Sequence, residues 1–216
     1  MEWPDWLESW DRATFLDIHR GLHALDSPML DGYLRWTNEL GSGFVLVTVV
    51  GLCVALGLSF RSSLRGLAQA GLAIALSTLV THLIKGWLDH PRPGRVFATG
   101  FADGDLVLAF GTPVREQAFP SGHTATAFAL ALLVSAWATD IRSTPRRWFV
   151  RTLVFLLAGS TALARVYGGV HFPTDVIAGA IVGLLCAMLA LRLVRRPVLD
   201  AAGPLNPPAT PPPTAT

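Results

Sequence analysis

The sequence predicts an all-α, polytopic membrane helical bundle with about five transmembrane helices and an N-terminal interfacial amphipathic helix. Composition is the first indication, because 51% of the 216 residues are apolar and only 15% are charged, whereas soluble domains carry about 25% charged residues. The second is a series of apolar stretches that approach the roughly 20 residues of helix needed to cross a bilayer. The net charge of +2, with no basic runs interleaved with aromatic residues, argues against nucleic-acid binding.

The predicted spans form a core domain over residues 43–196. They lie at about 43–60, 66–84, 121–138, 148–166 and 174–194. The last span contains "GAIVG", from Gly179 to Gly183, whose small residues permit close helix contact, and we expect that contact within the chain. Cys53 and Cys186 both fall inside spans, and we interpret them as small buried hydrophobic side chains.

Two segments flank this core. Residues 1–42 carry apolar side chains at roughly helical spacing, with charged residues between them and a break at Ser27-Pro28. The pattern fits an amphipathic helix in the membrane interface, and equally a helix packed on the bundle. His19 and His23 lie on this segment and are expected to face solvent or lipid headgroups. The Pro-rich tail, 197–216, is predicted to be disordered.

The distribution of arginine predicts the orientation of the chain. With five spans, the loops 61–65 and 139–147 share one side with the C-terminal end. These loops and the adjoining helix ends hold Arg61, Arg65, Arg142, Arg146, Arg147, Arg151, Arg192, Arg195 and Arg196. Basic residues mark the cytoplasmic side. We therefore expect a multi-pass protein of the cytoplasmic (inner) membrane whose other face, with the 85–120 loop, is periplasmic or extracellular.

Three polar stretches converge on that outer side. They are "KGWLDHPRP", "PSGH" from Pro120 to His123, and "RVYGGVHFPTD". Charged groups at membrane depth are costly, so a functional reason is expected. Lys85 is the only lysine among 17 basic side chains. Together with Arg92 and Arg165 it suggests an anion with several oxygens, and phosphate is the natural candidate.

The remaining residues of these stretches suggest chemistry on that anion. Ser121 and Gly122 open a helix whose backbone N–H groups can bind an oxyanion. Asp175 follows His171 by one helical turn, so its carboxylate can fix one ring nitrogen and leave the other as a nucleophile. His123 can serve as a general acid.

Other polar residues receive structural interpretations. His82 lies within a span and is expected to form a helix-to-helix hydrogen bond. His90 borders the first cluster and is either structural or a substrate contact. We expect no metal site and no cofactor, because the acidic residues of the 85–120 loop are scattered: Asp89, Asp103, Asp105 and Glu116.

The three stretches together resemble the signature of the type 2 phosphatidic acid phosphatase superfamily. That signature reads Lys, six residues, Arg-Pro; then Pro-Ser-Gly-His; then Ser-Arg, five residues, His, three residues, Asp. Order and spacing match, except that Ala164 replaces the serine before Arg165. The resemblance implies a helical bundle and metal-independent phosphoryl transfer.

The resemblance also implies a role for each residue. His171 would attack phosphorus and form a phosphohistidine, Asp175 would orient it, and His123 would protonate the leaving oxygen and then activate water. The residues expected to hold the phosphoryl oxygens are Lys85, Arg92, Ser121, Gly122 and Arg165.

The expected substrate is a membrane lipid phosphate or diphosphate. The short chain resembles bacterial members that act on undecaprenyl diphosphate. Phosphatidylglycerophosphate and phosphatidate are alternatives, as is a phosphotransferase using the same site. A non-catalytic lipid-binding protein would need the cations but not His123, His171 and Asp175.

Overall fold

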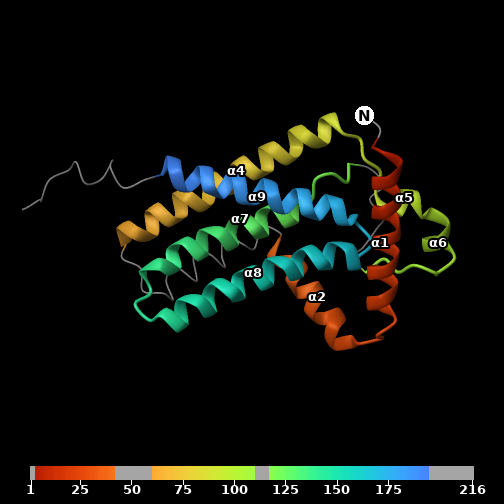
Figure 1. Ribbon diagram of the computed structural model, residues 1–216, viewed down its shortest axis with the longest axis horizontal. Coiled ribbons are helices and arrows are strands. Elements are labelled where there is room, and N and C mark those ends of the chain that lie inside the picture. The colour runs from red at the N-terminus through yellow and green to blue at the C-terminus, as the bar shows by residue number, and fades with distance from the viewer. Residues whose placement is uncertain (1–2, 42–59, 110–116, 195–216) are drawn as a thin grey trace, which may run out of the picture.

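The computed structural model describes residues 3–41, 60–109 and 117–194, and its regular elements there are helices (Figure 1). In chain order they are α1 (Asp5–His23), α2 (Pro28–Leu40), α4 (Phe60–Trp87), α5 (Pro93–Val96), α6 (Ala98–Ala102), α7 (Gly122–Trp137), the 3₁₀ turn η1 (Ala138–Asp140), α8 (Thr144–Tyr167) and α9 (Pro173–Leu193). The all-α prediction is confirmed. The predicted first span, 43–60, lies outside the described residues except for Phe60, and the predicted disordered tail, 197–216, lies outside them entirely.

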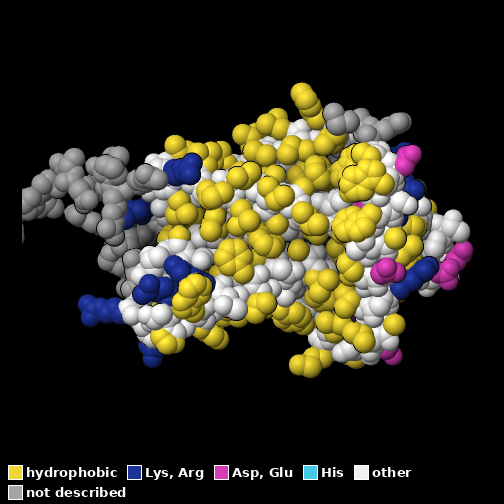
Figure 2. Space-filling view, in the orientation of Figure 1, with side chains coloured by type: hydrophobic (Ala, Val, Ile, Leu, Met, Phe, Trp, Pro, Cys, Tyr) yellow, Lys and Arg dark blue, Asp and Glu magenta, His cyan; other side chains and the backbone are white. Residues whose placement is uncertain are grey.

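Four apolar helices, α4, α7, α8 and α9, run lengthwise as a bundle (Figure 1). Within the described residues, α4, α8 and α9 are long and apolar enough to cross a membrane, and α7 is a shorter apolar helix. These helices match four of the predicted spans. Apolar side chains cover the flank of the bundle in Figure 2, as expected of a surface that faces lipid tails.

Helix α7 lies at the centre of the bundle, in contact with α4, α8 and α9. Its closest approach is to α9, where a Cβ on Gly179 or Gly183 would lie well inside 3.0 Å of the backbone carbonyls of Ser121 and Ala125. The "GAIVG" prediction is therefore confirmed as packing within the chain. This packing fixes the start of α7 against the start of α9.

Charged side chains are distributed unevenly along the bundle axis. On the face drawn in Figure 2, the end where α7 leads into α8 carries basic side chains, whereas the opposite end, beside α1 and α6, carries acidic and basic side chains together. Arg142 and Arg146 are exposed at the basic end. The basic side chains at this end are those expected from the arginines in the 139–147 loop, which the sequence assigns to the cytoplasmic side.

Helix α1 lies across the acidic end of the bundle and contacts α8 and α9, while α2 packs along α8 (Figure 1). The N-terminal segment is thus packed on the bundle. Phe15 is fully buried against Phe172 and Phe97, and Trp6 and Trp10 remain exposed.

The expectation that His19 is solvated is wrong. Its side chain is 1% exposed. Its Nε2 accepts a hydrogen bond from Val107 N at 3.1 Å, and its Nδ1 lies 3.4 Å from Val166 O. The neutral ring therefore ties α1 to the end of α8 and to the segment that follows α6. His23 is similarly bound, with Nε2 3.1 Å from Tyr167 O.

Stability should depend on pH through His19. Burial lowers the pKa of His19 from 6.5 to about 4, so the unfolded chain binds the proton more tightly. The stabilisation is complete above pH 6.5 and is lost as the pH falls toward 4, by about 3 kcal/mol in all. Thermal unfolding in detergent at several pH values measures this. His19→Gln keeps an acceptor for Val107 N but has no group that titrates. Between pH 6.5 and pH 4 the free energy of unfolding of this variant should therefore fall less than that of the wild type. Parallel losses in both proteins would refute the assignment.

Candidate active site

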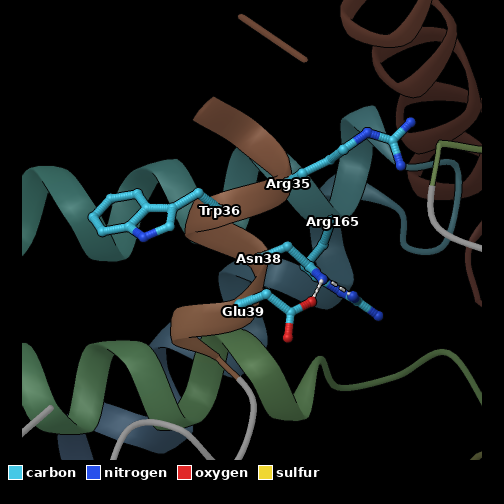
Figure 3. A pocket seen from close by; sticks show the side chains of 5 residues that line it. All are labelled: Arg35, Trp36, Asn38, Glu39 and Arg165. Carbon is cyan, nitrogen blue, oxygen red and sulfur yellow. Dashed lines mark hydrogen bonds between the residues drawn. The ribbon is translucent and has the colours of Figure 1, made fainter. Parts of the chain in front are cut away.

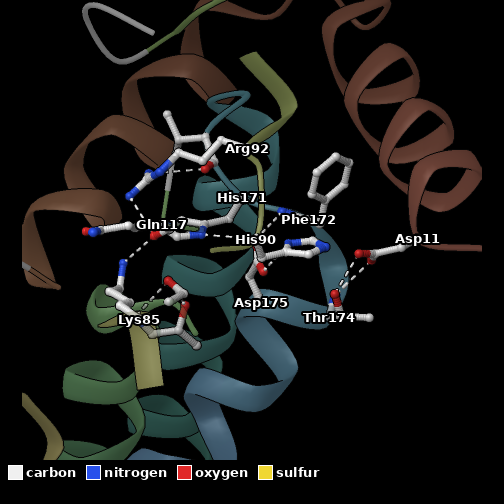
Figure 4. A network of polar contacts seen from close by, with 12 residues as sticks. Asp11, Lys85, His90, Arg92, Gln117, His171, Phe172, Thr174 and Asp175 are labelled. Atoms are coloured by element: carbon white, nitrogen blue, oxygen red, sulfur yellow. Dashed lines mark hydrogen bonds and ion pairs between the residues drawn. The ribbon is translucent and has the colours of Figure 1, made fainter. Parts of the chain in front are cut away.

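The centre of the site is a buried pair, His171 and Asp175, at the junction of α8 and α9 (Figure 4). Nδ1 of His171 lies 3.3 Å from Oδ2 of Asp175. The same oxygen accepts a hydrogen bond from Phe172 N at 2.8 Å, which fixes the carboxylate at the first turn of α9. An imidazole that donates from Nδ1 keeps its lone pair on Nε2, so the second nitrogen is available as a nucleophile.

The turn before His171 explains why the pair sits there. Gly169 has φ of +73°, and a Cβ on it would press against Phe101 and the carbonyl of Val107. This left-handed residue turns the chain back so that Val170 N and His171 N both donate to Arg165 O at 3.2 Å. Pro173 then starts α9. The local sequence thus places the histidine directly beside the arginine.

Lys85 and Arg92 are joined through one backbone oxygen. Lys85 Nζ donates to Gln117 O at 2.7 Å, and Arg92 Nη2 donates to the same oxygen at 3.5 Å. Arg92 Nη1 also donates to Val170 O at 3.2 Å. The first predicted cluster is thereby brought to the His171 turn (Figure 4).

Arg165 reaches the site from the last turn of α8 and is almost completely buried. Its Nη1 donates to Asn38 Oδ1 at 2.6 Å, while its Nε has no hydrogen-bond partner among the described residues. Asn38 belongs to α2 and was not anticipated, because nothing in a single polar residue of an amphipathic helix indicates a contact with α8. Ala164, which replaces the signature serine, is buried in an apolar cluster with Leu34 and Tyr167.

A pocket of about 580 Å³ opens beside Arg165 (Figure 3). Its lining side chains come from α2 and α8: Arg35, Trp36, Asn38, Glu39 and Arg165. The pocket therefore connects the buried arginine to a partly apolar, partly charged surface.

The start of α7 completes the site. Ser121 is its N-cap, with Oγ accepting from Thr124 Oγ1 at 3.0 Å, and Ser121 N donates to Asp175 O at 2.9 Å. His123 follows in the first turn of α7 and packs closely on Gly41. A Cβ added to Gly41 would lie 2.7 Å from the Cβ of His123. A Cβ on Gly122 would meet nothing within 4 Å, so its backbone faces open space.

Charged and titratable side chains of the three stretches therefore lie close enough to influence one another electrostatically. His123 interacts electrostatically with the positive charges of Arg165, Arg92 and Lys85. His171 interacts in the same way with those of Arg165 and Arg92. Burial is the main cause that lowers the pKa of His171 well below its usual value, and the bond to Asp175 opposes it. At neutral pH the ring is uncharged, which is the state required of a nucleophile.

The two histidines not yet described, His82 and His90, lie in different surroundings. His82 is exposed, and its Nδ1 lies 2.9 Å from Thr78 O within α4. The expected helix-to-helix bond is therefore wrong, since a helical residue also reaches the carbonyl one turn earlier. His90 lies inside the site, with Nδ1 3.6 Å from Asp175 Oδ1.

Asp11 of α1 is a supporting residue that sequence analysis did not single out. It is buried, accepts from Thr174 N at 3.0 Å and from Thr174 Oγ1 at 2.6 Å, and so caps the start of α9 from another helix. An acid on an amphipathic surface gives no sign of such a role.

We expect Asp11→Ala to lower the free energy of unfolding by about 2 kcal/mol, because two charge-assisted hydrogen bonds are lost. Asp11→Asn keeps the acceptor for Thr174 N and should lose less than half as much. Thermal unfolding of both variants in detergent measures the difference. Equal losses would show that the bonds to Thr174 are not the cause.

Comparison with known proteins gives the family. A model described as the PAP2 superfamily matches residues 66–198. The undecaprenyl-diphosphatase of Sulfolobus acidocaldarius is 32% identical over 177 residues, which are 82% of this chain and 74% of that protein. Phosphatidylglycerophosphatase B of Bacillus subtilis is 26% identical over 178 residues, covering 80% of this chain and 79% of that protein.

The chain is much shorter than one of its relatives, and it resembles a solved structure. The chain spans 39% of the length of a dihydrosphingosine 1-phosphate phosphatase of Saccharomyces cerevisiae, with 26% identity over 171 residues, or 78% of this chain. The crystal structure of Aquifex aeolicus LpxE superposes with a TM-score of 0.63 at 29% identity, covering 83% of this chain and 93% of that one. The family match covers more than half of the sequence, and the chain therefore belongs to the PAP2 superfamily of membrane proteins, whose relatives named here are lipid phosphatases.

Proposed function

We propose that this protein removes a phosphoryl group from a membrane lipid phosphate or diphosphate through a phosphohistidine at His171, without a metal ion. The observation that supports the proposal is the buried contact of His171 Nδ1 with Asp175 Oδ2, which would leave Nε2 free to attack phosphorus. The names of the relatives, phosphatidylglycerophosphatase and undecaprenyl-diphosphatase, support the same class of reaction.

The phosphoryl oxygens would be held by Lys85, Arg92 and Arg165, with the backbone of Gly122 and the hydroxyl of Ser121 as further donors. Gln117 O now accepts from both Lys85 and Arg92, and a phosphate oxygen would compete for the same donors. Phosphoryl transfer depends mainly on positioning and on stabilisation of the charge on these oxygens. A buried Arg165 and the half-buried Lys85 and Arg92, each already held by hydrogen bonds, would supply both.

The reaction would proceed in two halves. Nε2 of His171 attacks phosphorus, the bond from phosphorus to the lipid oxygen breaks, and His123 gives its proton to that oxygen. Bound phosphate offsets the charge of the cations around His123, which favours the protonated ring needed for this step. His123 then takes a proton from water, the water oxygen attacks phosphorus, and the N–P bond breaks to release phosphate.

The site is formed where α7 and α9 begin and α8 ends, at the α1 end of the bundle (Figure 1) and opposite the arginine-rich end where α7 leads into α8 (Figure 2). By the arginine rule, it would face the periplasm or the exterior from the cytoplasmic membrane, with exposed Trp6 and Trp10 of α1 at the membrane surface. A lipid can keep its tail in the bilayer while its phosphate reaches Lys85. Undecaprenyl diphosphate is the first candidate, and phosphatidylglycerophosphate and phosphatidate are the alternatives.

Phosphate release by the purified protein in detergent with EDTA tests the proposal. Undecaprenyl diphosphate, phosphatidylglycerophosphate and phosphatidate are offered separately. We expect release from one of them, undiminished by EDTA. Release only after a lipid or sugar alcohol is added would instead identify a phosphotransferase, and binding without turnover would contradict an enzymatic role.

A further inference from the structure

The carboxylate of Asp175 faces a second histidine. Its Oδ2 is occupied by His171 and Phe172 N. Its Oδ1 is buried and has no hydrogen-bond partner among the described residues, and the same holds for Nδ1 of His90, which lies 3.6 Å away. Two complementary polar atoms thus face each other, and burying both of them unpaired would be costly.

The ring of His90 is held in this place from several sides. It stacks on Trp3 with ring centroids 4.4 Å apart and an interplanar angle of 24°, and it meets the ring of Phe172 edge-on at 5.9 Å. Its carbonyl accepts a hydrogen bond from Ala118 N at 2.9 Å. Only 10% of its side chain is exposed. The ring is therefore preorganised toward Oδ1.

We propose that His90 is a positioning residue that donates from Nδ1 to Asp175 Oδ1, so that His90, Asp175 and His171 form one chain of polar contacts (Figure 4). The inference rests on the proposed function, in which His171 becomes positively charged as it attacks phosphorus. A carboxylate held at both oxygens cannot rotate away from His171. Catalytic hydrogen bonds are often long without substrate and shorten in the reacting complex.

The location of His90 in the chain suits this role. His90 lies between Lys85 and Arg92, on the segment that delivers both cations. One stretch would therefore hold the phosphate and, through Asp175, orient the nucleophile. In metal sites, removal of a group that orients a ligating histidine typically costs about 10- to 100-fold in affinity or activity, and we expect a loss of similar size here.

Three substitutions separate this role from simple packing. His90→Phe keeps an aromatic ring against Trp3 but has no N–H. His90→Asn puts an amide nitrogen near the position of Nδ1, whereas His90→Gln puts it near that of Nε2. Steady-state kinetics in detergent should show kcat reduced about tenfold or more in His90→Phe and His90→Gln, with KM nearly unchanged and kcat largely restored in His90→Asn. Full kcat in His90→Phe, or equal losses in all three variants, would overturn the proposal.

A measurement that needs no turnover completes the test. Nitrogen-15 labelling of histidine, with His90→Phe to assign the signal, reports which nitrogen of His90 carries the proton. We expect a proton on Nδ1 of His90, with a signal that moves in Asp175→Asn. A ring protonated only on Nε2 would refute the contact. If the wild-type protein releases no phosphate from any lipid, the proposed function fails, and this spectrum still decides the contact of His90 with Asp175.

Discussion

Replacement of His171 by alanine should reduce phosphate release at least about 1,000-fold while leaving the protein folded. The reason is chemical, because His171 is placed to donate from Nδ1 to the buried carboxylate of Asp175, which keeps its Nε2 free to attack phosphorus. Loss of a nucleophile typically costs factors of this size or more. Initial rates with the preferred lipid, measured in detergent with EDTA, give the number.

A matched histidine provides the control for this variant. His82 is exposed on α4 and bonded within its own helix, so His82→Ala should retain wild-type turnover. Both proteins should elute from size exclusion and unfold thermally like the wild type. Substantial release by a folded His171→Ala protein would remove His171 from the role of nucleophile.

Gly183→Ala should lower the free energy of unfolding by about 3 kcal/mol, the upper end of the usual range for overpacking. The added methyl group would collide with the backbone of Ala125 on α7, and a helix backbone cannot move aside as a flexible side chain can. The helices would have to separate where α7 presents Ser121 and His123. Unfolding of the purified variant by heat or by a denaturing detergent measures the loss.

The contrast with another helical glycine makes this prediction specific. A Cβ on Gly159 of α8 would meet nothing within 4 Å, so Gly159→Ala should be neutral or slightly stabilising. If both variants lose the same stability, the effect belongs to glycine in general and not to the contact of α7 with α9.

Much of the architecture was predictable because it follows from local patterns. Apolar length predicted helices at 66–84, 121–138, 148–166 and 174–194, and the "GAIVG" spacing predicted a close contact. The four-residue spacing of His171 and Asp175 at a predicted helix start allows the imidazole and the carboxylate to meet, so their contact could be expected from the sequence.

The supporting contacts could not be predicted in this way. The periodicity of α1 shows which side is apolar, but a membrane surface and the end of a bundle are equally able to cover that side. Only the packing of α1 on α8 and α9 reveals that His19 and Asp11 are buried. Likewise, Asn38 accepts a hydrogen bond from Arg165, which is 127 residues further along the chain. No local sequence pattern predicts a contact between residues so far apart in the sequence.

Trapping the phosphohistidine would show whether the phosphoryl group passes through His171 on its way from the lipid to water. The purified protein would be mixed with phosphorus-32-labelled lipid in EDTA, quenched in alkali within the first turnover, and digested for peptide mapping. We expect a phosphate that is stable in alkali, labile in acid and located on His171, with none in His171→Ala. Turnover without any trapped phosphoenzyme, or a phosphate on another residue, would contradict this route.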